Sequence, residues 1–195
     1  MNKNIVLCGV GGQGTVLASR LISAAAMKEG LPVQSAETIG MAQRGGSVFS
    51  HIRIGEGVNT PMIGLGQADL ILGFELGETV RQLPYLKPDG RVIAADRAVM
   101  PVTASLAGGY DPSAMKDYLK RTVGDGSFLS KLQIVDVETA FAELGSSKVL
   151  NLLLLGAAHR ADALGLKESS LIDAIKENVP PKFTELNLDA FRYDK

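Results

Sequence analysis

A glycine-rich turn with the sequence GVGGQG occupies residues 9–14, directly after an apolar run at residues 4–8. Apolar residues then recur at helical spacing over residues 15–28, so the turn joins an expected strand to an expected helix. Backbone N–H groups converge at such a turn, at the positive end of the helix dipole, which suits a phosphate or carboxylate. Gln13 and Thr15 add an amide and a hydroxyl. The turn predicts an anion site, although close helix–sheet packing would need the same glycines.

A second polar, glycine-rich stretch at residues 37–46 ends in Arg44-Gly45-Gly46. An arginine beside glycine is sterically open, and its guanidinium offers paired donors to phosphate or carboxylate. Glu37 has the spacing from the turn at which dinucleotide-binding proteins place the acid that holds the ribose hydroxyls. The candidate ligand-binding residues are Gly9, Gly11, Gly12, Gln13, Gly14, Thr15, Glu37, Arg44, Gly45 and Gly46. We expect no catalytic residue and no metal ligand in this chain.

The composition limits the classes of function. The 195 residues are 46% hydrophobic and 21% charged, as in an ordinary globular domain. The net charge of −1 provides no general field for nucleic acid or an anionic membrane. The single cysteine, Cys8, lies in an expected core strand and cannot alone hold an iron–sulfur cluster or a structural zinc. Without a signal-peptide pattern or a spanning segment, we expect a cytoplasmic protein with no nucleic-acid or membrane partner.

Strands and helices alternate along the chain, which predicts a three-layer α/β/α Rossmann-like domain with a mostly parallel sheet. The expected strands are 4–8, 31–35, 47–54, 58–60, 69–74, 91–95 and 132–137. The expected helices are 15–28, 76–83, 112–123, 138–144, 147–164, 168–178 and 183–191. A hairpin at Gly55–Gly57 would pair residues 47–54 with 58–60 and make the sheet mixed. Residues from about 138 onward would form a helical C-terminal extension of the same domain, 1–195.

Two further features leave alternatives open. His51 and Arg53 share one face of an expected strand, either as functional groups or as a solvated face. The helix expected at 147–164 is apolar almost all round, which fits burial in the core or a subunit contact.

Taken together, GVGGQG and AETIGMAQRGGSVFSHIRIG (residues 36–55) resemble the small subunit of 2-oxoacid:ferredoxin oxidoreductases, in particular the beta subunit of indolepyruvate oxidoreductase. The sequence resembles the gamma subunits of the pyruvate and 2-oxoglutarate enzymes more loosely. The run MAQRGGSV at 41–48 is the specific part. The resemblance continues through ADLILGFE (68–75), Pro101, Asn151 with LGA (155–157), and KFTELNLDAF (182–191). Ile39 departs from the family pattern, in which histidine is common there, and this bears on the identity of the oxoacid.

In that family, thiamine diphosphate attacks the 2-oxo carbon, electrons pass through iron–sulfur clusters to ferredoxin, and coenzyme A takes the acyl group. The resemblance implies that a large partner subunit carries thiamine diphosphate, Mg²⁺ and the 4Fe–4S clusters. Gly124-Asp125-Gly126 resembles the start of a thiamine motif, but a charged helix precedes it instead of a buried strand. The resemblance implies that this chain helps to bind coenzyme A and meets ferredoxin only indirectly. We expect the isolated chain to be inactive, with a homodimer through the exposed partner surface.

Two other classes of function stay open. The fingerprint and Glu37 would also fit a self-contained NAD- or FAD-binding protein. The glycine turn could equally belong to a non-catalytic scaffold subunit that binds no ligand.

Overall fold

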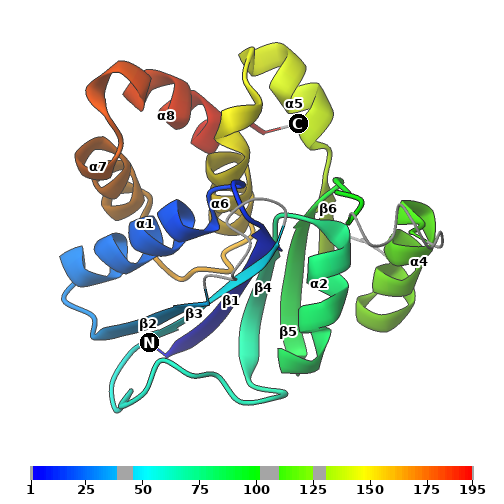
Figure 1. Ribbon diagram of the computed structural model, residues 1–195. Coiled ribbons are helices and arrows are strands. Elements are labelled where there is room, and N and C mark those ends of the chain that lie inside the picture. Colours follow the sequence, from blue (N-terminus) through cyan, green and yellow to red (C-terminus); the bar gives the residue numbers. More distant parts are fainter. Residues whose placement is uncertain (1, 39–45, 102–109, 125–130, 195) are drawn as a thin grey trace.

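The computed structural model describes residues 2–38, 46–101, 110–124 and 131–194. Within these residues the strands form one sheet in the order β2-β3-β1-β4-β5-β6 (Figure 1). The strands are β1 (Lys3–Val10), β2 (Val33–Thr38), β3 (Ser47–Ile54), β4 (Ala68–Gly73), β5 (Leu86–Ala95) and β6 (Leu132–Val135). Neighbours β1, β4, β5 and β6 are parallel, whereas β3 is antiparallel to both β1 and β2. The predicted mixed, mostly parallel α/β sheet is confirmed.

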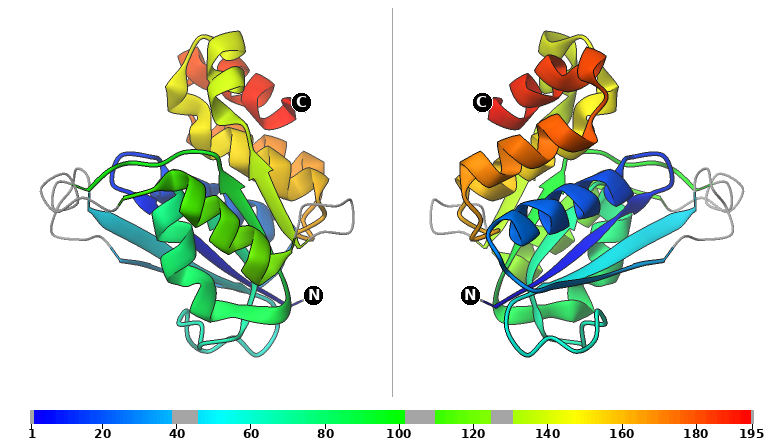
Figure 2. Two further views of the ribbon diagram at one scale, coloured as in Figure 1. Left: turned by 90° about the vertical axis from the view of Figure 1, so that its right-hand side faces the viewer. Right: turned by 90° about the vertical axis from the view of Figure 1, so that its left-hand side faces the viewer.

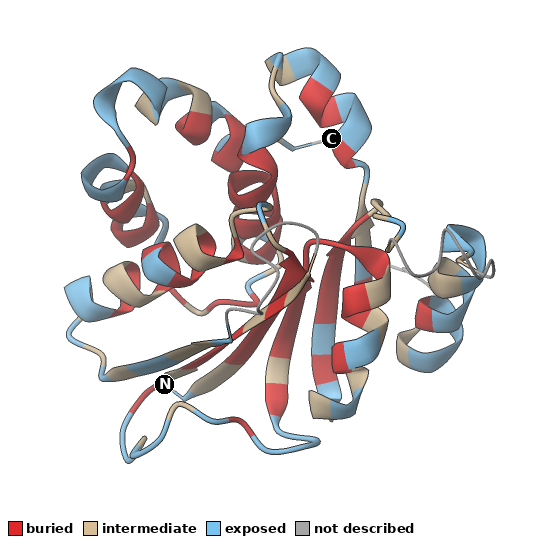
Figure 3. Ribbon diagram, viewed as in Figure 1, coloured by how far each residue is buried: buried red, intermediate tan, exposed pale blue. Residues whose placement is uncertain are grey.

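Helices cover both faces of the sheet, so the fold has three layers (Figure 2). The α-helices are α1 (Thr15–Lys28), α2 (Leu76–Gln82), α4 (Pro112–Val123), α5 (Val137–Leu144), α6 (Leu150–Arg160), α7 (Glu168–Asn178) and α8 (Thr184–Arg192). Short 3-10 turns occupy Leu83–Tyr85, Ser147–Val149 and Pro181–Phe183. Because side chains of a strand alternate, Ile5 and Leu7 of β1 join the core under α1 and α6, while Val6 and Cys8 join the core under α2 and α4. Figure 3 shows both cores as buried segments.

The sheet contains antiparallel pairing, as predicted, but not through the hairpin expected at Gly55–Gly57. Residues 58–60 form no strand, so the predicted return after Gly55–Gly57 is wrong. Instead β3 pairs with β2 on one side and with β1 on the other. Pairing with two strands gives hydrogen-bond partners to the backbone N–H and C=O groups on both edges of β3, whereas a short local hairpin would pair only one edge. This register also sets Ser47 opposite Val10, at the end of β1.

The apolar helix expected at 147–164 is shorter and lies inside the protein. It begins as the 3-10 turn at Ser147–Val149 and continues as α6, which ends before Asp162, where φ is 52°. Every residue from Leu150 to Ala158 is buried, and α6 packs against α1, α8 and β5. Burial within the chain therefore explains this helix without a subunit contact. Among the described residues, no helix is long and apolar enough to cross a membrane.

Candidate functional site

The glycine-rich turn leaves β1 at the carboxyl edge of the sheet and enters α1. No side chain fits at Gly9, because a Cβ atom there would lie 2.6 Å from Gln13 Oε1 and 2.8 Å from Phe74 Cβ. Gly12 and Gly14 have φ values of 99° and 83°, in the left-handed region that favours glycine. Backbone geometry thus accounts for these three glycines, and it brings the turn tightly against the strand ends.

The two glycine-rich stretches predicted from the sequence meet at this turn. The Gly11 N–H donates to the Gly46 carbonyl oxygen at 2.9 Å, next to the pairing of Val10 with Ser47. Residues Gly9–Thr15 together with Gly46 are called the glycine rim below. The rim therefore joins segments that are far apart in the chain.

Gln13 supports the rim from inside. Its Oε1 accepts a hydrogen bond from Val10 N at 2.7 Å, and its own backbone N–H donates to the Val10 carbonyl oxygen at 3.2 Å. Its Nε2 is fully enclosed and has no hydrogen-bond partner within the described part of the chain. An enclosed, unpaired donor is costly, so an acceptor brought by a ligand would stabilise this amide.

The N-terminus of α1 is open to an anion. The first N–H groups of a helix have no acceptor within the helix. Gly14, the N-cap residue, has no side chain to supply one, and the first turn contains no acidic residue. Thr15, the first residue of α1, is only 4% exposed. The positive end of the helix dipole is therefore uncompensated by the helix itself, and it favours a negatively charged group.

Two buried carboxylates next to the rim were missed by sequence reasoning. The Glu75 carboxylate caps α2 and accepts hydrogen bonds from Glu78 N at 2.7 Å, from Val99 N at 3.1 Å and from the Tyr110 hydroxyl. The Glu78 carboxylate accepts from the Ser47 hydroxyl at 2.6 Å. These residues tie the start of β3 and two segments after β5 to α2. An acidic residue directly after an apolar strand was the available signal, since that is an N-cap position.

Burial sets the protonation of two neighbouring groups. Burial, reinforced by the Glu75 carboxylate, raises the pKa of Tyr110 well above its usual range, so the hydroxyl remains a donor. Burial, and then the charge of Glu78, raises the pKa of the Cys8 thiol, which stays neutral. Cys8 is a buried core residue, as the sequence predicts.

Glu37 lies apart from the glycine rim. It pairs across the sheet with Ser50 of β3, and Ser50 pairs with Leu7 of β1. Two strand spacings, about 10 Å, therefore separate the Glu37 and Leu7 backbones. In dinucleotide-binding folds the acidic residue ends a strand next to the first one, and β3 takes that place here. Arg44 and Gly45, the other predicted ligands, lie outside the described residues.

His51 and Arg53 do not form a solvated face; they hold the loop after β3. Arg53 Nε donates to Asn4 Oδ1 at 3.0 Å, and Nη1 donates to the Thr60 carbonyl oxygen at 3.2 Å. His51 is 1% exposed, and its Nδ1 accepts a hydrogen bond from Ile63 N at 3.1 Å. Both side chains thus serve the fold, and neither reaches the glycine rim.

Protonation of His51 is expected to destabilise the protein. Burial lowers the pKa of His51 below its usual value. The unfolded chain binds this proton near pH 6.5, whereas the folded chain resists it, so stability present above about pH 6.5 is lost as the pH falls towards the folded pKa. Urea unfolding at pH 7.5 and pH 5.5 should show a smaller loss for His51→Gln than for the wild type. An equal loss of stability in His51→Gln and in the wild type would contradict this role of His51.

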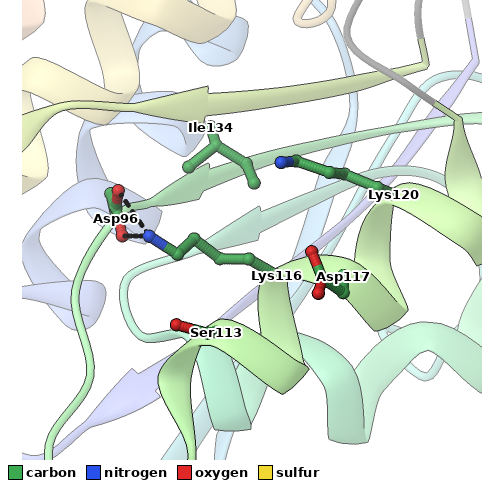
Figure 4. Close-up of a pocket in the computed structure, with 6 residues that line it drawn as sticks. All are labelled: Asp96, Ser113, Lys116, Asp117, Lys120 and Ile134. Carbon is green, nitrogen blue, oxygen red and sulfur yellow. Dashed lines mark hydrogen bonds and ion pairs between the residues drawn. The ribbon is translucent and has the colours of Figure 1, made fainter.

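A cavity of about 390 Å³ lies beside α4, on the face of the sheet opposite α1 (Figure 4). Its lining residues are Asp96, Ser113, Lys116, Asp117, Lys120 and Ile134. Lys116 Nζ lies 3.1 Å from each carboxylate oxygen of Asp96. This pair largely cancels its own charge, and the cavity is not part of the glycine rim. No group of three or more metal-ligating side chains occurs within the described ranges.

The fold and the rim define an α/β protein that presents an open helix N-terminus at the carboxyl edge of a mixed sheet. A family model described as pyruvate ferredoxin/flavodoxin oxidoreductase matches residues 4–193. The indolepyruvate oxidoreductase subunit IorB of Thermococcus kodakarensis is 37% identical, over 96% of this chain and 92% of its own length. The chain therefore belongs to the pyruvate ferredoxin/flavodoxin oxidoreductase family, as a small subunit of a 2-oxoacid:ferredoxin oxidoreductase. The predicted resemblance is confirmed.

Two solved structures share the fold. The pyruvate oxidoreductase subunit PORC of Thermotoga maritima has a TM-score of 0.68 at 22% identity, covering 98% of this chain and 93% of that chain. The 2-oxoglutarate:ferredoxin oxidoreductase of Magnetococcus marinus, with 2-oxoglutarate, coenzyme A and succinyl-CoA bound, has a TM-score of 0.70 at 18% identity. This match covers 97% of the present chain but 30% of that one, so the fold recurs there as part of a longer polypeptide.

Proposed function

We propose that this subunit completes an enzyme that oxidatively decarboxylates a 2-oxoacid, with indolepyruvate as the substrate, to the acyl-CoA and reduces ferredoxin. The whole chain acts as one gamma-type domain in the cytoplasm. A large partner subunit carries thiamine diphosphate, Mg²⁺ and the 4Fe–4S clusters and passes electrons to ferredoxin. One buried cysteine cannot hold a cluster. Of the residues that resemble the start of a thiamine motif, Gly124 is the C-cap of α4, and Asp125 and Gly126 lie outside the described residues.

The part of this chain in the reaction is to hold coenzyme A by its phosphoryl groups at the glycine rim. The observation that carries this proposal is the uncapped N-terminus of α1 at Gly14. The enclosed Nε2 of Gln13 adds a donor to the same rim. Arg44, whose stretch joins the rim at Gly46, would add a positive charge. The structure from Magnetococcus marinus supports the choice of ligand, since coenzyme A is bound to that enzyme.

Reconstitution with the large subunit tests the assembly. The purified chain alone should show no 2-oxoacid-dependent reduction of ferredoxin, and addition of the large subunit should give turnover. Turnover by the isolated chain would contradict the proposal. Tight binding of NAD(H) to the isolated chain would favour the self-contained dinucleotide-binding alternative instead.

Gly14→Ala tests the binding of coenzyme A. Alanine at a φ of 83° is strained, and its Cβ would lie 2.9 Å from Asn151 Nδ2, so either the backbone at the start of α1 or the Asn151 side chain must shift. We expect a rise of about 10-fold in the KM for coenzyme A of the reconstituted enzyme, with a smaller effect on the KM for the oxoacid. Arg44→Ala should act in the same direction.

Gly57→Ala is the matched control, because Gly57 has a φ of 76° and a Cβ atom added there would have no other atom within 4 Å. It carries the same backbone strain far from the rim, so its KM for coenzyme A should equal that of the wild type. Unchanged KM values in both Gly14→Ala and Arg44→Ala would leave this chain as a scaffold subunit that does not touch coenzyme A.

A further inference from the structure

Asn151 lies in the first turn of α6 and is only 4% exposed. Its amide packs against the residue that begins α1, since a Cβ atom on Gly14 would lie 2.9 Å from Nδ2 and 3.1 Å from Cγ. Helices α1 and α6 are in contact on the same face of the sheet (Figure 1). A polar side chain from the C-terminal half of the chain therefore borders the glycine rim.

The hydrogen bonds of this amide are incomplete. The Leu152 N–H donates to Asn151 Oδ1 at 3.1 Å, which fixes which amide atom is the oxygen. Nδ2 carries two N–H donors, and it has no acceptor among the described residues. Nδ2 is the Asn151 atom nearest to the position that a Cβ atom on Gly14 would take, so it faces the N-cap of α1. A side chain that is nine-tenths buried thus directs a free donor at the N-terminus of α1.

Two neighbours on the rim add further polar groups. Thr15, the first residue of α1, is 4% exposed and carries a side-chain hydroxyl beside the Gly14 N-cap. Gln13 Nε2 is enclosed and unpaired. The buried carboxylates next to the rim, those of Glu75 and Glu78, already accept hydrogen bonds from Glu78 N and from the Ser47 hydroxyl. The rim therefore collects donors, and this arrangement matches an oxyanion and opposes a cation.

We propose that Asn151 is a ligand-binding residue, which donates from Nδ2 to a phosphoryl oxygen held at the N-terminus of α1, together with the Thr15 hydroxyl. The role rests on the proposed function, in which the phosphoryl group belongs to coenzyme A. A neutral amide suits this position, because burying a lysine there would require a desolvated charge, whereas an amide supplies two donors at lower cost. The site takes the pyrophosphate class of ligand and adds α6 to the glycine rim.

Titration of the full-length chain with inorganic pyrophosphate tests this role, followed by NMR and calorimetry. In the wild type, the side-chain amide signals of Asn151 should shift together with the backbone amides of Gly14 and Thr15. Asn151→Asp has the same shape but replaces the donor with an acceptor, and it should weaken pyrophosphate binding at least 10-fold. The matched control is Asn187→Asp. Asn187 is also buried, but its Nδ2 already donates to the Phe183 carbonyl oxygen at 2.7 Å.

The outcomes separate this proposal from the one above. If Asn151→Asp fails to fold, the proposal is tested by whether pyrophosphate shifts the Asn151 side-chain amide signals of the wild type. Backbone shifts at Gly14 without an Asn151 side-chain shift, or no response to pyrophosphate, would overturn the proposal. A pyrophosphate site that needs Asn151, with an unchanged KM for coenzyme A in Gly14→Ala, would uphold Asn151 and refute the coenzyme A role. A raised KM for coenzyme A in Gly14→Ala, with pyrophosphate binding unaffected by Asn151→Asp, would uphold the coenzyme A role of the glycine rim and refute the role of Asn151.

Discussion

Replacing Glu75 by alanine is expected to lower the free energy of unfolding by about 3–5 kcal/mol. The carboxylate is 1% exposed and accepts three hydrogen bonds, from Glu78 N, Val99 N and the Tyr110 hydroxyl. The change would remove the N-cap of α2 and leave these three donors without their acceptor, each a loss of about 1 kcal/mol or more. Urea denaturation at neutral pH measures the effect, and the melting temperature should fall by roughly 10 °C.

The loss of stability in Tyr110→Phe is the reference against which the loss in Glu75→Ala is compared. It removes a single donor from Glu75 and keeps the ring, so its cost should be about 1 kcal/mol. The loss of stability in the double variant should be smaller than the sum of the losses in the two single variants, because both changes remove the same hydrogen bond. A loss in Glu75→Ala no larger than that in Tyr110→Phe would show that Glu75 is not the centre of this network.

The sequence predicts the local elements well where one physical rule decides them. The turn at residues 9–14 and helix α1 follow from glycine spacing and helical periodicity, and both are present. Asp111-Pro112 predicts the start of α4, and the Asp111 carboxylate does accept hydrogen bonds from Ser113 N and Ala114 N. These signals are local, so neighbouring residues suffice to fix the structure.

The order of the strands could not be predicted in the same way. Gly55–Gly57 carries the local chemistry of a hairpin, and this favoured residues 58–60 as the next strand. Pairing with β1 and β2 decided otherwise, because β3 gains two hydrogen-bonded neighbours there. The same pairing moves Glu37 one strand away from β1. Its sequence spacing could not reveal that intervening strand.

The glycine rim was predicted because its glycines carry a recognisable spacing, whereas the polar groups around it were not. Glu75, Glu78 and Asn151 act through partners distant in the chain. Asn151 lies in a helix that the sequence predicts to be apolar almost all round. Only its contact with Gly14 reveals an unpaired donor next to the rim. Such a role depends on two helices meeting, which one-dimensional periodicity does not specify.

Replacing Gly156 by alanine is expected to destabilise the protein by about 3 kcal/mol and to lower its melting temperature by roughly 6–12 °C. Helix propensity alone predicts the opposite sign, a gain of about 1 kcal/mol in the interior of α6. The contact decides, because a Cβ atom at this position would overlap the Phe191 carbonyl oxygen of α8. That oxygen is backbone, so no side-chain rotation relieves the overlap, and it also accepts a hydrogen bond from Arg160 Nη1 at 3.0 Å.

Thermal unfolding of Gly156→Ala beside Ser169→Ala measures the two effects separately. Ser169 is an exposed residue of α7, so its replacement reports helix propensity without a new contact and should change stability by less than about 0.5 kcal/mol. A melting temperature for Gly156→Ala equal to or above that of the wild type would contradict the close packing of α6 and α8. A large loss would show that the close approach of Gly156 to the Phe191 carbonyl oxygen holds α6 against α8.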